Sequence, residues 1–229
     1  MTRHPLTLVT KAVRPFVLDR SHTCLLLQDL HAPFTDLDAG ALLRTARARG
    51  VACEFDEYTD ALRLIAPVIG QVLAAFRERQ IAVVYSCLGY RTGQAPSGFQ
   101  EATGWRWDLD GPDGAFPTAW EPLPGEPVFE KPGWGALLNT ALRRYLAERD
   151  ITSVAVLGTM CEFGIRQTCA ELGDSGLGAL VVSDGVVALT REAAAYTAGD
   201  IAHGMTKLRT AAELLDLLDR LDSEEYVVV

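Results

Sequence analysis

Short runs of aliphatic and β-branched residues alternate along the chain with longer segments of helical spacing. The apolar runs have the length of buried strands and lie at 23–27, 81–85, 128–129, 153–157 and 179–182. Helical spacing of apolar residues is found at 58–79, 135–149, 162–172, 191–203 and 211–221. An alternation of strands and helices implies right-handed crossovers and a mostly parallel sheet that is covered on both faces. The pattern therefore predicts an α/β protein.

Two stretches interrupt this alternation. We expect residues 1–229 to form a single domain with an insert at about 34–56 and a long loop at about 88–127, because no repeat or flexible linker divides the chain. The basic helical piece ALLRTARARG in the insert is interpreted as a solvated surface helix, with a lid over a site as the alternative. The long loop contains Trp105, Trp107 and Trp120, which favour a packed loop that walls a pocket over simple surface cover.

Composition narrows the class of protein further. Hydrophobic residues make up 48% of the 229 residues, which is enough for a sizeable core without a disulfide or metal. The net charge of −9 opposes the counterion release that drives nucleic-acid binding, so we expect no nucleic-acid partner. No run approaches 18 apolar residues and the N-terminus offers no signal-peptide core, so neither a membrane span nor export is expected.

The cysteines and histidines give little sign of a disulfide framework or a metal centre. The five cysteines are an odd number without a CxxC pair, which suits reduced thiols in a cytoplasmic protein. The four histidines form no HxH or HxxxH pair, so we expect no metal and no cofactor.

Candidate catalytic residues follow three of the predicted strands. Asp29 ends TCLLLQD, Lys131 ends PVFEK, and the loop Gly158–Glu162 leads from SVAVL into a helix. Ligands of open parallel sheets bind outside the carboxyl ends of the strands, so these three segments are expected to meet there. The sequence thus predicts a site for a small-molecule substrate that combines a carboxylate, an ammonium and a thiol or second carboxylate.

These segments resemble the isochorismatase-like hydrolases, also called cysteine hydrolases, over most of the chain. The resemblance rests on LLLQDLHAPF, on PVFEKPGWGALLNTALRRYL with the loop before it, and on SVAVLGTMCEFGIRQTCAEL and ALVVSDGVVALT. It implies a three-layer α/β/α sandwich around a mostly parallel six-stranded sheet, oligomerisation, and catalytic roles for Asp29 and Lys131. The substrate contacts that it implies are Phe34, Leu88, Trp134, Thr159, Met160, Glu162 and Gly164.

One departure from the family pattern changes the expected chemistry. Aligning Gly158 and Thr168 with the family's glycine and threonine places Gly164 where the nucleophilic cysteine belongs. Some isochorismatases are similar in this respect, and their aspartate protonates a vinyl ether so that water can add without a covalent intermediate. We therefore expect Asp29, assisted by Lys131, to act as a general acid on a vinyl ether or a similarly activated C–O or C–N bond, with specialised metabolism as one setting for such a substrate. Burial favours an acid and the charge of Lys131 favours a base, so the sequence leaves the direction of proton transfer open, and Lys131 has stabilisation of developing negative charge on the substrate as an alternative role. Leu88 replaces a polar residue, which makes isochorismate itself a doubtful substrate.

Three alternatives remain open. Cys161 could be a displaced nucleophile of an amide hydrolase, although a small packing side chain is the simpler interpretation. The protein could instead be a non-catalytic binding protein, or could catalyse a non-hydrolytic rearrangement or elimination.

The roles of several polar residues are also left open. Glu162 is expected to complement a helix dipole, with a substrate contact or second acid as the alternative. His31 is interpreted as a surface residue at a helix start, with a catalytic partner of Asp29 as the alternative, and Asp184 as a cap of the next turn. The tail EEYVVV either pairs with a subunit edge or frays.

Overall fold

A six-stranded parallel sheet forms the centre of the computed structural model, which describes residues 15–203 and 206–229. The strand order is β4-β3-β2-β5-β6-β7, and every neighbouring pair is parallel. The strands are β2 (Thr23–Gln28), β3 (Ala82–Leu88), β4 (Val128–Lys131), β5 (Ser153–Thr159), β6 (Gly178–Val187) and β7 (Thr206–Arg209). The predicted three-layer α/β/α architecture with six strands is confirmed. The sixth strand, β7, has the sequence TKLR and lacks an apolar run.

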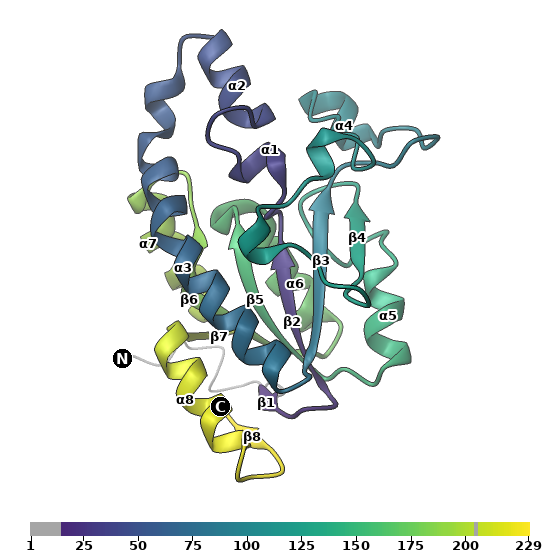
Figure 1. Cartoon of the computed structure of the whole chain (residues 1–229), viewed down its shortest axis with the longest axis vertical. Helices are drawn as coiled ribbons and strands as arrows, with labels where there is room; N and C mark the ends of the chain where they lie inside the picture. The colour runs from purple at the N-terminus through teal and green to yellow at the C-terminus, as the bar shows by residue number, and fades with distance from the viewer. Residues whose placement is uncertain (1–14, 204–205) are drawn as a thin grey trace.

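Helices cover both faces of the sheet. Alternate residues of β2 point to opposite faces, so that Leu25 and Leu27 join one core cluster and Cys24 and Leu26 join the other. The first cluster lies under α3 (Asp56–Glu78) and α8 (Ala211–Leu221), and the second under α5 (Leu142–Glu148), α6 (Arg166–Asp174) and α7 (Arg191–His203). Figure 1 shows α3 and α8 on the near face of the sheet.

The stretch Ala52–Glu78, which includes α3, is long and apolar enough to cross a membrane by length and composition alone. In the fold, this apolar character is explained by packing of α3 against the sheet. Ile69, Val72 and Phe76 are buried in the core beneath α3.

The insert and most of the long loop lie beyond the carboxyl ends of β2, β3 and β4, and the last part of the loop runs back along the sheet to the start of β4 (Figure 1). The insert contains α1 (Ala32–Thr35), α2 (Ala41–Ala48) and the short η2 (Ala52–Phe55), and α2 buries its leucines while its arginines are exposed. The long loop contains α4 (Gly98–Thr103), η3 (Pro112–Gly114) and η4 (Thr118–Trp120). Trp107 and Trp120 are buried, and Trp120 Nε1 donates a hydrogen bond to the Leu30 carbonyl. The loop is thus packed, as its tryptophans predicted.

Two predicted elements need correction. The helix expected at 135–149 is present only from Leu142, because Asn139 adopts a positive φ of 58° and backbone N–H groups before it bond to side chains of α6 instead of forming helix turns. The C-terminal tail, expected to fray or to pair with a subunit edge, does neither. It forms β8 (Val227–Val228), which pairs antiparallel with β1 (Val17–Leu18) of the same chain.

Candidate active site

Asp29 follows β2 directly and is held by the neighbouring strand β3. Its backbone N–H donates to the Ser86 carbonyl over 2.8 Å, and its Oδ1 accepts the Leu88 N–H over 2.7 Å. The backbone of Asp29 has a φ of 53°, in the left-handed region that few residues other than glycine, asparagine and aspartate adopt. Strained backbone of this kind is concentrated at functional sites. Gln80, Asn139 and Asp150 share a positive φ, so the backbone of Asp29 is consistent with a functional position and does not by itself identify one.

Lys131, the last residue of β4, lies against this carboxylate. Its Nζ is 2.8 Å from Asp29 Oδ2, and the two side chains are 0% and 2% exposed. The same Nζ donates to the Gly133 carbonyl over 3.0 Å and to the Trp134 carbonyl over 2.8 Å. An ammonium has three hydrogens, so all the donors of Lys131 are used by these three acceptors. Burying an ion pair seldom stabilises a fold, which favours a functional reason for this one.

Gly164 borders the same carboxylate from η5 (Cys161–Ile165), a π-helical turn that leads into α6. A Cβ placed on Gly164 would lie 3.4 Å from Asp29 Oδ2 and only 2.3 Å from Gln28 Nε2. The side-chain amide of Gln28 thus fills the space beside Asp29 into which a side chain at position 164 would project. Sequence reasoning missed Gln28, which is one polar residue at the end of an apolar strand.

Two hydrogen bonds fix the orientation of the Gln28 amide. Nε2 donates to the Trp134 carbonyl over 3.3 Å, and Oε1 accepts from Thr168 Oγ1 over 2.7 Å. The Trp134 carbonyl is an acceptor only, so the nitrogen must face it. This carbonyl serves both Gln28 and Lys131, and it therefore links the amide to the Asp29–Lys131 pair.

Thr159 and Tyr58 pack behind Asp29. Thr159 Oγ1 donates to the Asp29 carbonyl over 2.9 Å, and Tyr58 Oη donates to the Phe34 carbonyl over 2.9 Å. Burial is the main cause that raises the pKa of Tyr58, with the nearby charges of Asp29 and Glu162 adding to it. Tyr58 comes from α3, and no signal in the sequence connects it with the site.

An aromatic cluster, which we define as Phe34, Trp105, Trp107, Trp134 and Phe163, joins four separate segments around the site. Trp105 stacks on Trp107 with ring centroids 5.3 Å apart, and Trp134 stacks on Phe163 at 4.8 Å. Phe34 meets Trp107 edge to face at 4.9 Å, and Trp105 meets Trp134 in the same way at 5.1 Å. Of the expected substrate contacts, Phe34 and Trp134 thus belong to one aromatic surface.

Other expected contacts have different surroundings. The Leu88 side chain is part of the core, and only its backbone N–H reaches Asp29. Met160 is buried in the same core cluster. Glu162 Oε1 accepts the Leu189 N–H over 2.8 Å, while its Oε2 is buried with no hydrogen-bond partner among the described residues.

Cys161 lies apart from Asp29, in the second core cluster. It lines a hollow of about 50 Å³ with residues of β6, α7 and β7. Burial, with a smaller contribution from Glu162, raises the pKa of its thiol to about 12. A thiol in this environment is a poor nucleophile at neutral pH.

Asp184 is not a cap of the next turn. Its Oδ1 accepts the Ala211 N–H over 2.7 Å at the start of α8, so it caps a helix that lies farther along the chain.

The interpretation of His31 as a surface residue is wrong. The ring is 0% exposed and lies among Phe34, Trp107 and Phe116. Its Nε2 is 3.1 Å from the Leu88 carbonyl, and its Nδ1 has no partner among the described residues. Desolvation by burial, opposed in part by the charge of Asp29, lowers the pKa of His31 to about 4. His31 is therefore neutral in the folded protein at pH 7.

This burial predicts a pH dependence of stability. The unfolded chain binds a proton at His31 near pH 6.5 and the folded chain only near pH 4, so the free energy of unfolding falls as the pH drops through this window. The expected contribution is about 3 kcal/mol, present above pH 6.5 and lost near pH 4. Urea unfolding at several pH values should show a flatter profile for His31→Gln than for the wild type. Parallel profiles would contradict the assignment.

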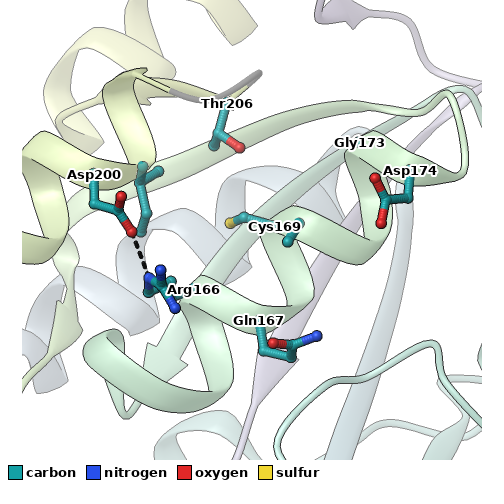
Figure 2. A pocket seen from close by; sticks show the side chains of 9 residues that line it. Arg166, Gln167, Cys169, Gly173, Asp174, Asp200 and Thr206 are labelled. Atoms are coloured by element: carbon teal, nitrogen blue, oxygen red, sulfur yellow. Dashed lines mark hydrogen bonds and ion pairs between the residues drawn. The ribbon is translucent and has the colours of Figure 1, made fainter.

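Surface hollows elsewhere are separate from the Asp29–Lys131 pair. The hollow in Figure 2, of about 290 Å³, lies between α6, α7 and β7, with an ion pair between Arg166 and Asp200 at its edge. A hollow of about 360 Å³ is closer to the pair, because Gly133 and Trp134 line it and their carbonyls hold Lys131. Across the residues described, no group of three or more His, Cys, Asp or Glu side chains could hold a metal ion.

The fold and the site together define a class of protein: a three-layer α/β/α protein with a buried carboxylate–ammonium pair at the carboxyl ends of its parallel strands. Residues 23–213 match the isochorismatase domain family. The chain belongs to this family and is an isochorismatase-like hydrolase. No match was found among the curated proteins.

Several solved structures share the fold. A cysteine hydrolase from Pseudomonas syringae pv. phaseolicola 1448A is 18% identical, with a TM-score of 0.76 over 92% of this chain and 98% of that one. The N-carbamoylsarcosine amidase from Thermoplasma acidophilum is 18% identical, with a TM-score of 0.63 over 83% and 97%. The pyrazinamidase of Pyrococcus horikoshii, solved in complex with zinc, is 14% identical, with a TM-score of 0.63 over 82% and 99%. These likenesses concern the fold.

Proposed function

We propose that this protein is a hydrolase that works without a thiol nucleophile, and that Asp29 transfers the proton. The observation that carries the proposal is that position 164, which borders Asp29 Oδ2, has no nucleophilic side chain. Gly164 offers no side chain there, and the Gln28 amide fills the space. The only cysteine of the strand-to-helix loop, Cys161, packs in the other core cluster with its pKa raised to about 12.

The proposed reaction is the hydrolysis of a small vinyl ether or a similarly activated bond. Asp29, which is paired with Lys131 as a carboxylate in the structure, takes up a proton from solvent before the reaction and gives it to the terminal carbon of the vinyl ether, which leaves an oxocarbenium ion and the Asp29 carboxylate. Water adds to the cation, and the proton that this water loses returns to the carboxylate. The resulting hemiketal then separates into a ketone and an alcohol. No bond to the protein forms at any step.

The contacts of Asp29 support this role. Leu88 N–H and Lys131 Nζ bind its two oxygens, as suits the carboxylate that remains after proton transfer. Lys131 has no hydrogen left for the substrate, so we assign it to positioning and charge balance of Asp29. Gln28 Nε2 has two hydrogens, and among the described residues the Trp134 carbonyl is its one acceptor. The second N–H is therefore the donor that we assign to a substrate oxygen.

A panel of substrates tests the proposal against amide hydrolysis. We expect turnover of a vinyl ether other than isochorismate, and not of N-carbamoylsarcosine or pyrazinamide. Iodoacetamide treatment and Cys161→Ser should each change the rate by less than about twofold, because neither removes a group that reacts. Turnover of an amide that is abolished by both treatments would support the displaced nucleophile instead.

A further inference from the structure

The Gln28 amide occupies the space into which a side chain at position 164 would project, directly beside Asp29. A Cβ on Gly164 would approach Gln28 Nε2 to 2.3 Å, which is closer than side-chain atoms pack, while its distances to the Trp134 carbonyl and Asp29 Oδ2, 3.3 and 3.4 Å, are tolerable. Gln28 is therefore the group that excludes a side chain at position 164. The Trp134 carbonyl, 3.3 Å from such a Cβ, would need to shift by only a few tenths of an ångström.

Gln28 cannot easily turn away from this space. Its side chain is completely buried, and both ends of its amide are engaged, one with the Trp134 carbonyl and the other with Thr168. Thr168 Oγ1 is itself tied to the backbone of the loop before α5, because it accepts the Ala136 N–H over 3.0 Å. Moving the amide would leave buried polar groups without partners, which is costly.

We propose that Gln28 is a specificity-determining residue: its amide takes the place of a nucleophile at position 164 and commits this site to thiol-free chemistry. The chemical consequence rests on the function proposed above, whereas the mutual exclusion of the two side chains does not. The pair Gln28 and Gly164 acts as a unit, because each residue is compatible with the site only in the presence of the other. A thiol at position 164 would lie beside Asp29 once the amide is removed.

A double-mutant cycle in thermal unfolding tests the exclusion without any substrate. Gly164→Ala is expected to lower Tm by about 5 °C or more, because it overpacks the site. In the Gln28→Ala background the same substitution should cost much less, since the overlapping amide is gone. In the Gln28→Met background, Gly164→Ala should still lower Tm strongly, because methionine keeps the volume of the glutamine side chain and removes only its hydrogen bonds. Gly70→Ala in α3, where a Cβ meets nothing within 4 Å, should not couple to Gln28.

A second measurement tests the consequence for a thiol. In a Cys53→Ser background, which removes the exposed cysteine, Gly164→Cys is compared with Gln28→Ala/Gly164→Cys. We expect iodoacetamide to alkylate the thiol at position 164 on the order of tenfold more slowly in the double variant, because only there can the thiol enter the buried space beside Asp29 and leave the solvent. Mass spectrometry locates the alkylated residue.

Defined outcomes overturn the inference. Additive Tm changes for Gln28→Ala and Gly164→Ala, or equal alkylation with and without Gln28, show that Gln28 does not exclude a side chain at position 164. A coupled cycle together with an active Asp29→Asn enzyme refutes the proposed function and leaves the exclusion intact. The two failures are therefore distinguishable.

Discussion

Asp29→Asn is expected to lower kcat by a factor of about 10² or more, because the variant keeps the shape of the side chain and loses the transferable proton. Asparagine tolerates the left-handed backbone of this position, so the local conformation should persist. The measurement is steady-state turnover of the vinyl ether that the wild type hydrolyses, with circular dichroism and urea unfolding to verify the fold.

Lys131→Met separates a loss of proton transfer from a general loss of site structure. It should also reduce kcat, but together with a marked loss of stability. An Asp29→Asn enzyme with a wild-type rate would end the proposed mechanism and would favour a binding protein that retains the site without using its carboxylate.

The second large effect is on stability. Lys131→Met should lower the free energy of unfolding by roughly 3–5 kcal/mol at pH 7, because it leaves the buried Asp29 carboxylate with no counter-charge. The side chain of methionine fills most of the space of the lysine stem, so the loss reports the unpaired charge. Urea unfolding measures it.

The matched control for this prediction is the double variant Asp29→Asn/Lys131→Met. It removes both charges and should recover a large part of the lost stability. If the double variant is as unstable as Lys131→Met alone, the loss comes from packing or from the Gly133 and Trp134 carbonyls, and the charge argument is wrong.

The sheet could be predicted because buried parallel strands are nearly continuous apolar runs, and four of its six strands have this signature, while the edge strand β4 shows only the apolar pair Val128 and Phe129. Strand β7 has the sequence TKLR and lacks it, since its place at the sheet edge leaves several positions partly exposed. The predicted start of the helix at residue 135 was wrong for another reason. Residues 136–138 have helical spacing, but their backbone N–H groups find better partners in Thr168 and Glu171, which only the folded chain brings near.

In the candidate site, too, the sequence could predict only the features that do not depend on contacts between distant segments. Asp29 and Lys131 could be singled out because each ends a strand, and parallel strands deliver their ends to one edge of the sheet. Gln28, Tyr58 and the burial of His31 could not be foreseen, because their significance comes from contacts with distant segments. Gln28 matters only beside Gly164, and His31 is buried only because the long loop packs over it.

The aromatic cluster has a consequence for kinetics. Because Asp29 and Lys131 are almost completely buried, the proposed reaction requires part of the surrounding structure to move before a substrate reaches them, and we expect the aromatic cluster to be the part that moves. The Trp134 carbonyl anchors both Lys131 and Gln28, so displacement of Trp134 would disturb the reacting groups, whereas Phe34, Trp105 and Phe163 have no such tie in the described structure. Under the proposed mechanism, opening of the site is therefore a separate step before the chemistry, and the rate of opening is an upper limit on turnover.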